Sequence, residues 1–369
     1  MQETAGCLIC TDCATEYPLD QPRWRCRCGG ALDIRSGVGL GSNLSSLSES
    51  TLWRYRQSIP VRNVSNIVSL GEGMTPIIPV RVGTRSVLVK QEQLMPTGSF
   101  KDRGASVLVS KAKELGIKRV ILDSSGNAGC AVAAYCARAG IQCKVFVPAD
   151  TNPAKLIQIT AYGAKVVKIR GSREDTAAAA LEAARRTYYA SHYWNPFFFQ
   201  GTKTLAFEVW EQLGGRAPDA LVLPVGNGTL VLGAYIGFSE LHRDRLIKRL
   251  PKIVAVQVRN CAPLVKAFHE NFQIIPVVKK KMTLAEGIAI NAPIRGRQII
   301  QAVHSTGGTF LAVTEEEISA ALRAMLRQGF YIEPTAAVAI AGTTRYLPTA
   351  RTGETIVTVF TGHGLKSAK

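Results

Sequence analysis

Short runs of β-branched residues alternate with longer amphipathic stretches from about residue 85 to the end of the chain. The first pattern is typical of strands, and the second is typical of helices with one apolar face. It predicts strands at 87–89, 119–122, 142–147, 165–169, 220–224, 253–258 and 355–360, and helices at 101–115, 128–139, 154–162, 173–188, 202–212, 230–241 and 315–328. Because helices of this length separate the strands, we expect an α/β fold whose parallel sheets are covered on both faces.

The first 32 residues break this pattern, because they are rich in Cys, Arg and Gly. Residues 33–60, with a serine-rich stretch at 42–46, are typical of a linker or an irregular covering segment. The longest apolar region, 220–238, is interrupted by two glycines and an asparagine, so no membrane-spanning helix is expected. The start of the chain lacks a basic segment followed by an apolar one. We therefore predict a cytoplasmic protein with no secretion signal and no membrane partner.

The chain carries 45 Lys and Arg against 27 Asp and Glu, a net charge of +18. Such a charge permits nucleic-acid binding, but the basic residues are dispersed and their only triplet is at 279–281. Dispersed charge favours a solvated surface whose field attracts small anionic ligands, so no nucleic acid is expected. A zinc-ribbon nucleic-acid-binding protein is the alternative from another functional class. It predicts binding that weakens steeply with salt.

Chemistry in a parallel α/β fold gathers where strands end and helices begin. Four such turns carry unusual residues, at 96–104, 123–129, 224–230 and 360–366. In the first turn, Lys101 follows Phe100 and a Gly-Ser pair, so its side chain can enter a pocket. Desolvation lowers the pKa of a lysine and lets it form a Schiff base with an aldehyde.

The second and third turns are rich in glycine, which lets the backbone approach a ligand and leaves the N–H groups of a helix start free for an anion. A helix cap formed by Ser124 or Ser125 would explain one serine, but not the whole Ser-Ser-Gly-Asn run. The loop at 226–229 matches neither a P-loop nor a dinucleotide fingerprint, so the phosphate of a smaller cofactor fits it better. In the fourth turn, Thr361 can offer a hydroxyl to a ring nitrogen.

Taken together, these turns resemble those of the fold-type II pyridoxal-phosphate enzymes, which are tryptophan synthase beta-like, and most closely those of the threonine synthase family. The motifs that carry the resemblance lie at 70–76, 99–104, 124–129, 201–204, 226–229, 333–337 and 361–366. The resemblance covers most of the chain. It implies two open parallel-sheet domains behind a small zinc-ribbon-like segment. The segment would be 1–32, the large cofactor-binding domain 33–103 plus 201–369, and the small mobile α/β domain 104–200.

The resemblance also assigns roles to individual residues. Lys101 would be the catalytic residue, holding pyridoxal 5′-phosphate as a Schiff base and moving protons. Asn127 would bond the 3′-oxygen of the cofactor, and Thr361 would face its ring nitrogen. The cofactor phosphate would be held by Gly226, Asn227, Gly228 and Thr229, and a small anionic amino-acid substrate by Ser124, Ser125, Thr97, Ser99 and Lys203. A homodimer is the family expectation.

The implied reaction, catalysed by a carbon–oxygen lyase acting on phosphates, converts O-phospho-L-homoserine and water to L-threonine and phosphate. Lys203 would attract the leaving phosphate, with Arg103 or Lys90 behind it. One segment departs from the family. Some threonine synthases carry Asn-Ser-x-Asn-Pro-x-Arg where this chain has residues 192–198, and the arginine position is Phe198. An aromatic ring cannot replace a bidentate guanidinium, so either another residue supplies the charge or the substrate differs.

Two related chemistries therefore stay open. Residues 283–289 are similar to a segment that threonine/serine dehydratases use near the cofactor. Such an enzyme needs no phosphate pocket. The other is β-replacement of the kind catalysed by cysteate synthase, which adds sulfite to phosphoserine.

Five of the nine cysteines lie within the first 28 residues. Four of them, Cys10, Cys13, Cys26 and Cys28, are spaced like a zinc ribbon, and four thiolates suit tetrahedral Zn²⁺. Similar ribbons precede the catalytic region in some threonine synthases. The second pair is Cys-x-Cys rather than Cys-x-x-Cys, so Cys7 is a possible substitute ligand, and reduced metal-free cysteines are the alternative.

Overall fold

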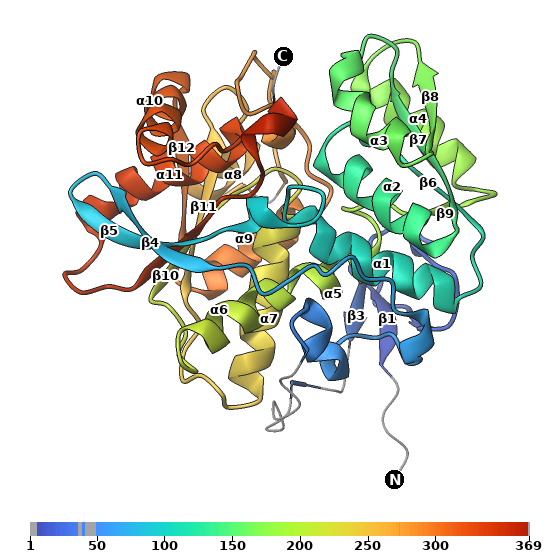
Figure 1. Cartoon of the computed structure of the whole chain (residues 1–369), viewed down its shortest axis with the longest axis horizontal. Helices are drawn as coiled ribbons and strands as arrows, with labels where there is room; N and C mark the ends of the chain where they lie inside the picture. Colours follow the sequence, from blue (N-terminus) through green and yellow to red (C-terminus); the bar gives the residue numbers. More distant parts are fainter. Residues whose placement is uncertain (1–5, 36–38, 41–48, 273, 368–369) are drawn as a thin grey trace. The chain divides into compact units, whose positions relative to one another are not determined.

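The structure is a computed structural model that describes residues 6–35, 39–40, 49–272 and 274–367. The serine-rich stretch at 42–46 lies outside the described residues. Contacts within the chain divide it into two compact units. The first unit comprises the described parts of residues 1–73 and 101–202, and the second comprises 74–100 and the described parts of 203–368 (Figure 1).

The second unit is built on a six-stranded sheet in the order β12-β11-β10-β13-β5-β4. All neighbouring strands run parallel except β4 and β5, which form an antiparallel hairpin. The strands are β4 (Ile77–Val82), β5 (Arg85–Lys90), β10 (Ala220–Pro224), β11 (Lys252–Val258), β12 (Thr309–Val313) and β13 (Ile356–Val359). Parallel pairing places the carboxyl ends of β10, β11, β12 and β13 at one edge of the sheet.

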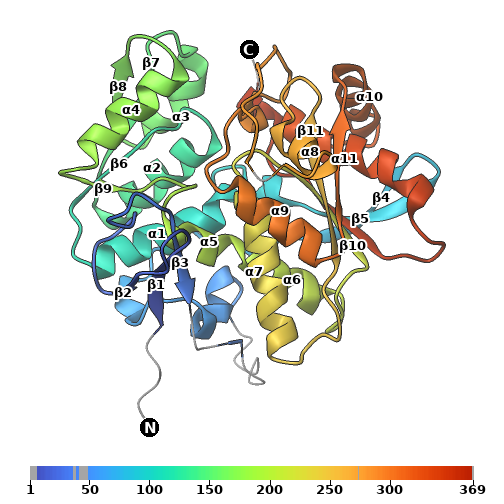
Figure 2. The ribbon, with the colours of Figure 1, turned by 180° about the vertical axis from the view of Figure 1, so that it is seen from behind.

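Helices cover both faces of this sheet (Figures 1 and 2). They are α6 (Thr204–Gln212), α7 (Thr229–Arg243), α8 (Pro263–His269), α9 (Gly296–Ser305), α10 (Glu315–Leu326) and α11 (Pro334–Tyr346), with 3₁₀ turns η3 (Glu92–Leu94), η5 (Glu286–Ile288), η6 (Leu347–Thr349) and η7 (Gly364–Ser367). Ala220 and Val222 of β10 share one core with Ala337 of α11. Leu221 points to the opposite face because side chains alternate along a strand, and there α7 packs on β10.

The first unit contains a four-stranded parallel sheet in the order β8-β7-β6-β9. Its strands are β6 (Arg119–Leu122), β7 (Gln142–Pro148), β8 (Lys165–Ile169) and β9 (Tyr188–Tyr189). Its helices are α1 (Lys101–Glu114), α2 (Asn127–Ala139), α3 (Ile157–Ala161), α4 (Arg173–Ala183) and α5 (Pro196–Thr202), with η1 (Leu52–Ser58), η2 (Val64–Asn66) and η4 (Pro153–Leu156). A separate antiparallel sheet, ordered β2-β1-β3, consists of β1 (Cys7–Cys10), β2 (Glu16–Pro18) and β3 (Leu32–Arg35).

Two glycines allow α1 and α5 to cross closely within the first unit. A Cβ atom on Gly201 would lie 1.9 Å from the carbonyl oxygen of Arg103, and one on Gly104 would lie 2.3 Å from the ring of Phe198. Neither contact is possible for a real Cβ, so helix packing alone requires glycine at both positions. This crossing gives the first residue of the Gly201–Thr204 motif a structural reason.

The predicted α/β fold with parallel sheets is confirmed, and most predicted elements have close counterparts. The helix expected over 173–188 is wrong at its end, because α4 stops at Ala183 and Tyr188 and Tyr189 pair with β6 as the edge strand β9. The helix expected over 202–212 is preceded by the separate helix α5. The predicted domain limits stay a prediction. They differ from the two units in residues 33–73, which belong to the first unit.

A buried ion pair links β5 to α6 in the second unit. Lys90 Nζ lies 2.7 Å from Glu208 Oε2, and both side chains are fully buried. The ammonium also donates to the carbonyl oxygen of Thr75 and to Gln212 Oε1, at 2.6 and 2.8 Å. Such a pair costs little while both charges are present, but one charge left alone in the core is expensive.

We expect Lys90→Met to lower the free energy of unfolding by about 3–5 kcal/mol, because Glu208 would stay buried without its cation. The double variant Lys90→Met/Glu208→Leu should recover most of that loss. Urea denaturation of the two variants and the parent protein gives the comparison. A double variant that is no more stable than the single one would contradict this explanation.

Candidate active site

The turn after β6 leads directly into α2 in the first unit. Gly126 is the N-cap residue of α2 and offers no side chain, so neither Ser124 nor Ser125 forms the helix cap weighed from the sequence. A Cβ atom on Gly129 would lie 1.9 Å from the carbonyl oxygen of Ser124, which shows how closely the turn folds back on the helix. An uncapped helix start leaves N–H groups available to an anion. The predicted residues Ser124, Ser125 and Asn127 thus line one partly exposed turn.

Asp123 anchors this turn to the core of the first unit. Its carboxylate is almost completely buried and accepts hydrogen bonds from the hydroxyls of Tyr189 and Tyr193 and from Nη2 of Arg173. Burial, followed by the charge of Asp123, raises the pKa of Tyr193 and that of Tyr189, so both hydroxyls act as neutral donors. The sequence analysis did not single out Asp123, although a carboxylate at the end of an apolar strand was a visible signal.

Lys101 is the first residue of α1 and is half-buried. Its Nζ lies 5.7 Å from the centroid of the Phe198 ring, within cation–π distance. His192 packs edge-on against Tyr193 and Phe198, with centroid distances of 4.9 and 6.0 Å. Burial, and then the positive charges of Lys101 and Arg173, hold the pKa of His192 well below its usual value. His192 is therefore neutral and lies in the field of both cations.

The segment that departs from the family pattern forms part of the core. Asn195 Nδ2 donates to the hydroxyl of Tyr188 at 2.9 Å and to the carbonyl oxygen of Tyr189 at 3.2 Å. Phe198 is fully buried against Gly104. This segment thus contributes an apolar wall beside Lys101, and position 198 carries no charge for a substrate.

The turn after β10 leads into α7 in the second unit. Gly228 is the N-cap residue with φ +78°, and a Cβ atom there would lie 2.3 Å from Ile299 Cδ1. A Cβ atom on Gly226 would lie 2.8 Å from the Cα atom of Ile288. Thr229 begins the helix and is almost fully buried. A buried helix start without a side-chain cap is a suitable place for a phosphate.

Thr361, the residue expected to face a ring nitrogen, follows β13 and is fully buried. Its hydroxyl donates to Glu333 Oε1 at 3.0 Å. Glu333 is the N-cap residue of α11, yet its carboxylate does not cap that helix. A Cβ atom on Gly362 would lie 2.4 Å from Glu333 Cδ, so glycine is needed for the carboxylate to reach Thr361. Glu333 was not predicted as a site residue, although it opens the 333–337 motif.

The remaining predicted substrate residues also belong to the second unit. Ser99 is fully buried, and its hydroxyl has no hydrogen-bond partner among the described residues. Thr97 is buried, and its carbonyl oxygen accepts a hydrogen bond from Lys366 at 2.8 Å. Lys203 is fully buried with Nζ 2.9 Å from Glu240 Oε1. Burial lowers the pKa of Lys203 and the carboxylate of Glu240 opposes that shift, so its charge already has a counter-ion.

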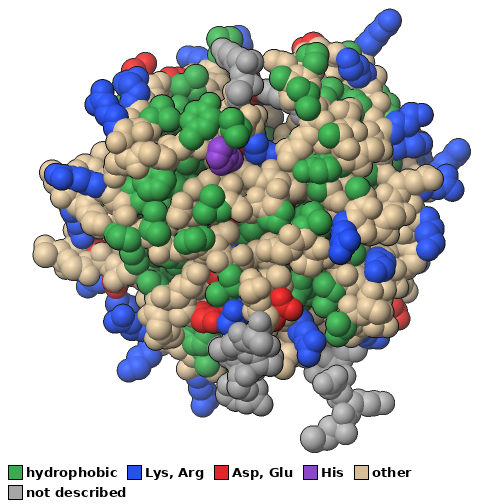
Figure 3. All heavy atoms as spheres, viewed as in Figure 1, with side chains coloured by type: hydrophobic (Ala, Val, Ile, Leu, Met, Phe, Trp, Pro, Cys, Tyr) green, Lys and Arg blue, Asp and Glu red, His purple; other side chains and the backbone are tan. Residues whose placement is uncertain are grey.

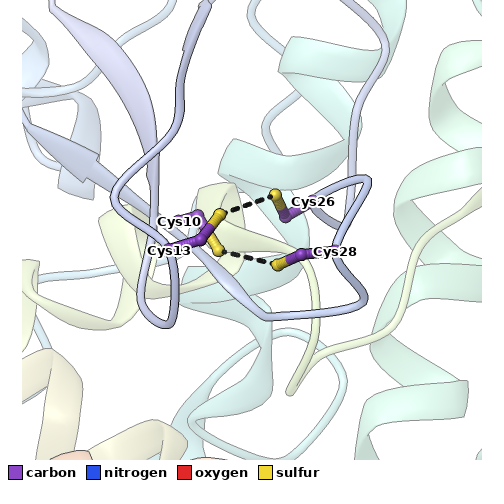
Figure 4. A group of neighbouring side chains, drawn as sticks. All are labelled: Cys10, Cys13, Cys26 and Cys28. Carbon is purple, nitrogen blue, oxygen red and sulfur yellow. Dashed lines mark hydrogen bonds between the residues drawn. The ribbon is translucent and has the colours of Figure 1, made fainter.

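Four cysteines of the N-terminal segment meet at one point (Figure 4). The sulfur atoms of Cys10, Cys13, Cys26 and Cys28 all lie within 4.8 Å of one another, with Cys10–Cys28 at 3.5 Å and Cys13–Cys26 at 3.6 Å. Tetrahedral zinc with Zn–S bonds of about 2.3 Å separates its sulfur atoms by about 3.8 Å. Cys7 is not in the group, and its thiol contacts Glu16 Oε2 at 3.4 Å.

Comparison with known proteins identifies the family. Residues 68–362 match the family model described as pyridoxal-phosphate dependent enzyme. The threonine synthase of Methanocaldococcus jannaschii is 36% identical over 97% of this chain and 92% of its own length. The chain belongs to the threonine synthase family of pyridoxal-phosphate-dependent enzymes. The threonine synthase of Methanosarcina acetivorans is 35% identical over the same shares of both chains.

Solved structures agree with the fold of this threonine synthase family member. A bacterial threonine deaminase has a crystal structure with a TM-score of 0.67 and 26% identity, over 78% of this chain and 92% of that one. Serine racemase from Dictyostelium discoideum gives a TM-score of 0.66 with 25% identity, over 79% and 92%. None of the described helices has the length and apolar character needed to cross a membrane.

The residues present fit the cofactor that names the family. The uncapped, buried start of α7 suits its phosphate, and the buried Ser99 hydroxyl still needs a partner. The half-buried amine of Lys101 suits its aldehyde. When bound, pyridoxal phosphate withdraws electrons from the Cα of an amino acid, which makes the Cα proton removable.

We expect Gly228→Ala to lower the free energy of unfolding by about 2–4 kcal/mol, because the methyl group meets Ile299 and the left-handed backbone disfavours alanine. Gly214→Ala is the matched control, since Gly214 also has positive φ but nothing within 4 Å of its Cβ position. It should cost only about 1–2 kcal/mol. Equal losses for the two variants, measured by urea denaturation, would show that the contact with Ile299 is unimportant.

Proposed function

We propose that this enzyme is a threonine synthase, which converts O-phospho-L-homoserine and water to L-threonine and phosphate. One observation supports this proposal above the others: two archaeal threonine synthases match 97% of the chain at 35–36% identity. Among related proteins, such even similarity over nearly the full length favours a shared reaction over a shared fold alone.

In this proposal, Lys101 holds the cofactor through its amine and then moves protons at the Cα and Cβ atoms of the substrate. Asn127 bonds the 3′-oxygen of the cofactor and Thr361 faces its ring nitrogen. The backbone of Gly226–Thr229 binds the cofactor phosphate. The contact between Thr361 and Glu333 supports the role of Thr361, because a hydroxyl that donates to a carboxylate still has lone pairs for a further hydrogen bond.

The substrate is assigned to the turn at Ser124 and Ser125, whose hydroxyls and helix-start N–H groups suit a carboxylate. Thr97 and Ser99 stay proposed substrate residues, and the unpartnered Ser99 hydroxyl supports that assignment. Lys203 also stays a proposal. Its pairing with Glu240 makes it a weaker anion binder than the sequence alone implied.

A threonine/serine dehydratase is the second candidate, and two observations favour it. Phe198 leaves the expected arginine position apolar, as an enzyme without a phosphorylated substrate would allow. The 283–289 segment also packs against the phosphate turn, because the Cα atom of Ile288 lies beside Gly226. The threonine deaminase described above is similar in fold. Cysteate synthase-like β-replacement stays the third candidate.

The decisive experiment supplies O-phospho-L-homoserine, O-phospho-L-serine with sulfite, and L-threonine in parallel to the purified holoenzyme. We expect threonine and phosphate from the first substrate only. Lys101→Ala should abolish this reaction and the labelling of the chain by borohydride, since the amine that holds the cofactor is gone. Lys113→Ala, on the exposed side of the same helix, should change neither. If 2-oxobutyrate from threonine is the only product, the dehydratase is correct.

We also propose that the four clustered cysteines bind structural Zn²⁺. The proximity of their sulfur atoms supports this, as does the small size of the N-terminal sheet, which a metal would stabilise (Figure 4). The side chains of β1 alternate between two faces, so Cys7 and Cys10 point to opposite sides of the strand. Cys7 is therefore left out of the proposed ligand set.

Elemental analysis of the purified protein should give about one zinc per chain. Cys10→Ser and Cys26→Ser should each lose the metal and lower the melting temperature of the protein, because a structural zinc contributes directly to folding. Cys7→Ser is the matched control and should keep the full zinc content. Metal loss in Cys7→Ser, with retention in Cys26→Ser, would refute the ligand set.

The other expectations stay proposals for this enzyme. These are a cytoplasmic location, a homodimer and a mobile small domain over 104–200. The basic residues are scattered over the visible face and separated by apolar and uncharged atoms, which supports a small anionic amino acid rather than a nucleic acid as the partner (Figure 3).

A further inference from the structure

Arg173 stands out among the cations of the first unit because a buried carboxylate fixes it from one side only. It is the first residue of α4, after the N-cap residue Ser172. Its Nη2 donates to the carbonyl oxygen of Asp123 and, at 2.7 Å, to Oδ2 of the same residue. Asp123 is 1% exposed, whereas the side chain of Arg173 is 47% exposed. The guanidinium is therefore held firmly and still reaches solvent.

The rest of this guanidinium is available to a ligand. No described residue accepts a hydrogen bond from its Nη1 or Nε atoms. The carboxylate of Asp123 is also shared with the hydroxyls of Tyr189 and Tyr193, so Arg173 is one of three donors around it. A planar guanidinium with free N–H groups is the usual partner of a phosphate or carboxylate.

The position of Arg173 connects it to the proposed substrate turn. The carbonyl oxygen that it binds belongs to the residue directly before Ser124. The charges of Lys101 and Arg173 both act on His192, which places these three side chains in one neighbourhood of the first unit. Because His192 is neutral, Lys101 and Arg173 together leave this neighbourhood with an excess of positive charge over Asp123.

We propose that Arg173 binds the anionic group at the end of the substrate side chain, and so supplies the charge that Phe198 does not. This inference rests on the proposed function, in which that group is the phosphate of O-phospho-L-homoserine. Ser124 and Ser125 hold the α-carboxylate, and Arg173 selects phosphorylated over unphosphorylated amino acids. Residues 192–198 then form an apolar wall rather than a phosphate site.

The competing explanation is that Arg173 only stabilises Asp123 and the turn that follows it. The two explanations differ in what a substitution does to ligands without a phosphate. A residue that only shapes the turn affects all amino-acid ligands alike. A residue that touches the phosphate affects phosphorylated ligands alone.

The test uses the holoenzyme and follows the change in cofactor absorbance as O-phospho-L-homoserine, O-phospho-L-serine or L-homoserine is added. Arg173→Gln should weaken both phosphorylated ligands by about 10- to 100-fold, because a charged hydrogen bond is lost. L-homoserine should bind within about twofold of the wild-type value. Arg173→Lys, which keeps the charge without the fork, should fall between the two.

Arg185→Gln is the matched control, since Arg185 follows the end of α4 and pairs with Glu182 on the surface. It should change none of the three titrations, and melting temperatures confirm that each variant folds. The proposal is overturned if Arg173→Gln weakens all three ligands equally, if it weakens none, or if wild type does not prefer the phosphorylated ligands. The proposed function fails separately, if wild type binds O-phospho-L-homoserine but does not convert it to threonine.

Discussion

Parallel strand pairing is the constraint on which the organisation of this enzyme depends. It buries both faces of each parallel strand, so the strands themselves have no room for polar side chains. It also brings the ends of neighbouring strands to one edge, where each turn enters a helix. In both units the decisive turn has a glycine at the N-cap, Gly126 before α2 and Gly228 before α7. The chain thus presents helix N–H groups instead of side-chain caps, and this prepares each unit for an anion.

The second constraint is the handling of buried charge. Glu72 is fully buried and accepts hydrogen bonds from Trp53, Ser106 and Tyr135, and also from Ser69 and Leu70. Burial and nearby carboxylates raise the pKa of Tyr135, which keeps its hydroxyl a donor. The 70–76 motif therefore has a structural role in addition to its value for recognising the family. The pairs Lys90–Glu208 and Lys203–Glu240 follow the same rule.

Local features of this site could be predicted from the sequence, whereas long-range pairings could not. Lys101 at a helix start and the glycine turns at 124–129 and 226–229 depend on neighbouring residues, so motif and periodicity reveal them. The partner of Thr361 is 28 positions away, and the partner of Lys203 is 37 positions away. No periodicity connects such positions. The edge strand β9 was missed for a related reason, because two residues are too few to show a period and only pairing with β6 makes them a strand.

The same contrast decides which cations of this enzyme are able to bind a ligand. Lys203 lies within a conspicuous motif, but it is fully buried and its counter-ion Glu240 faces it at 2.9 Å. Arg173 lies in no motif, yet only one of its nitrogens is bonded and nearly half of its side chain is exposed. An ammonium surrounded by protein acceptors has little left for a substrate, whereas a guanidinium fixed at one edge is oriented without being saturated. The net charge of +18 cannot separate these two cases. The geometry of the counter-ion can.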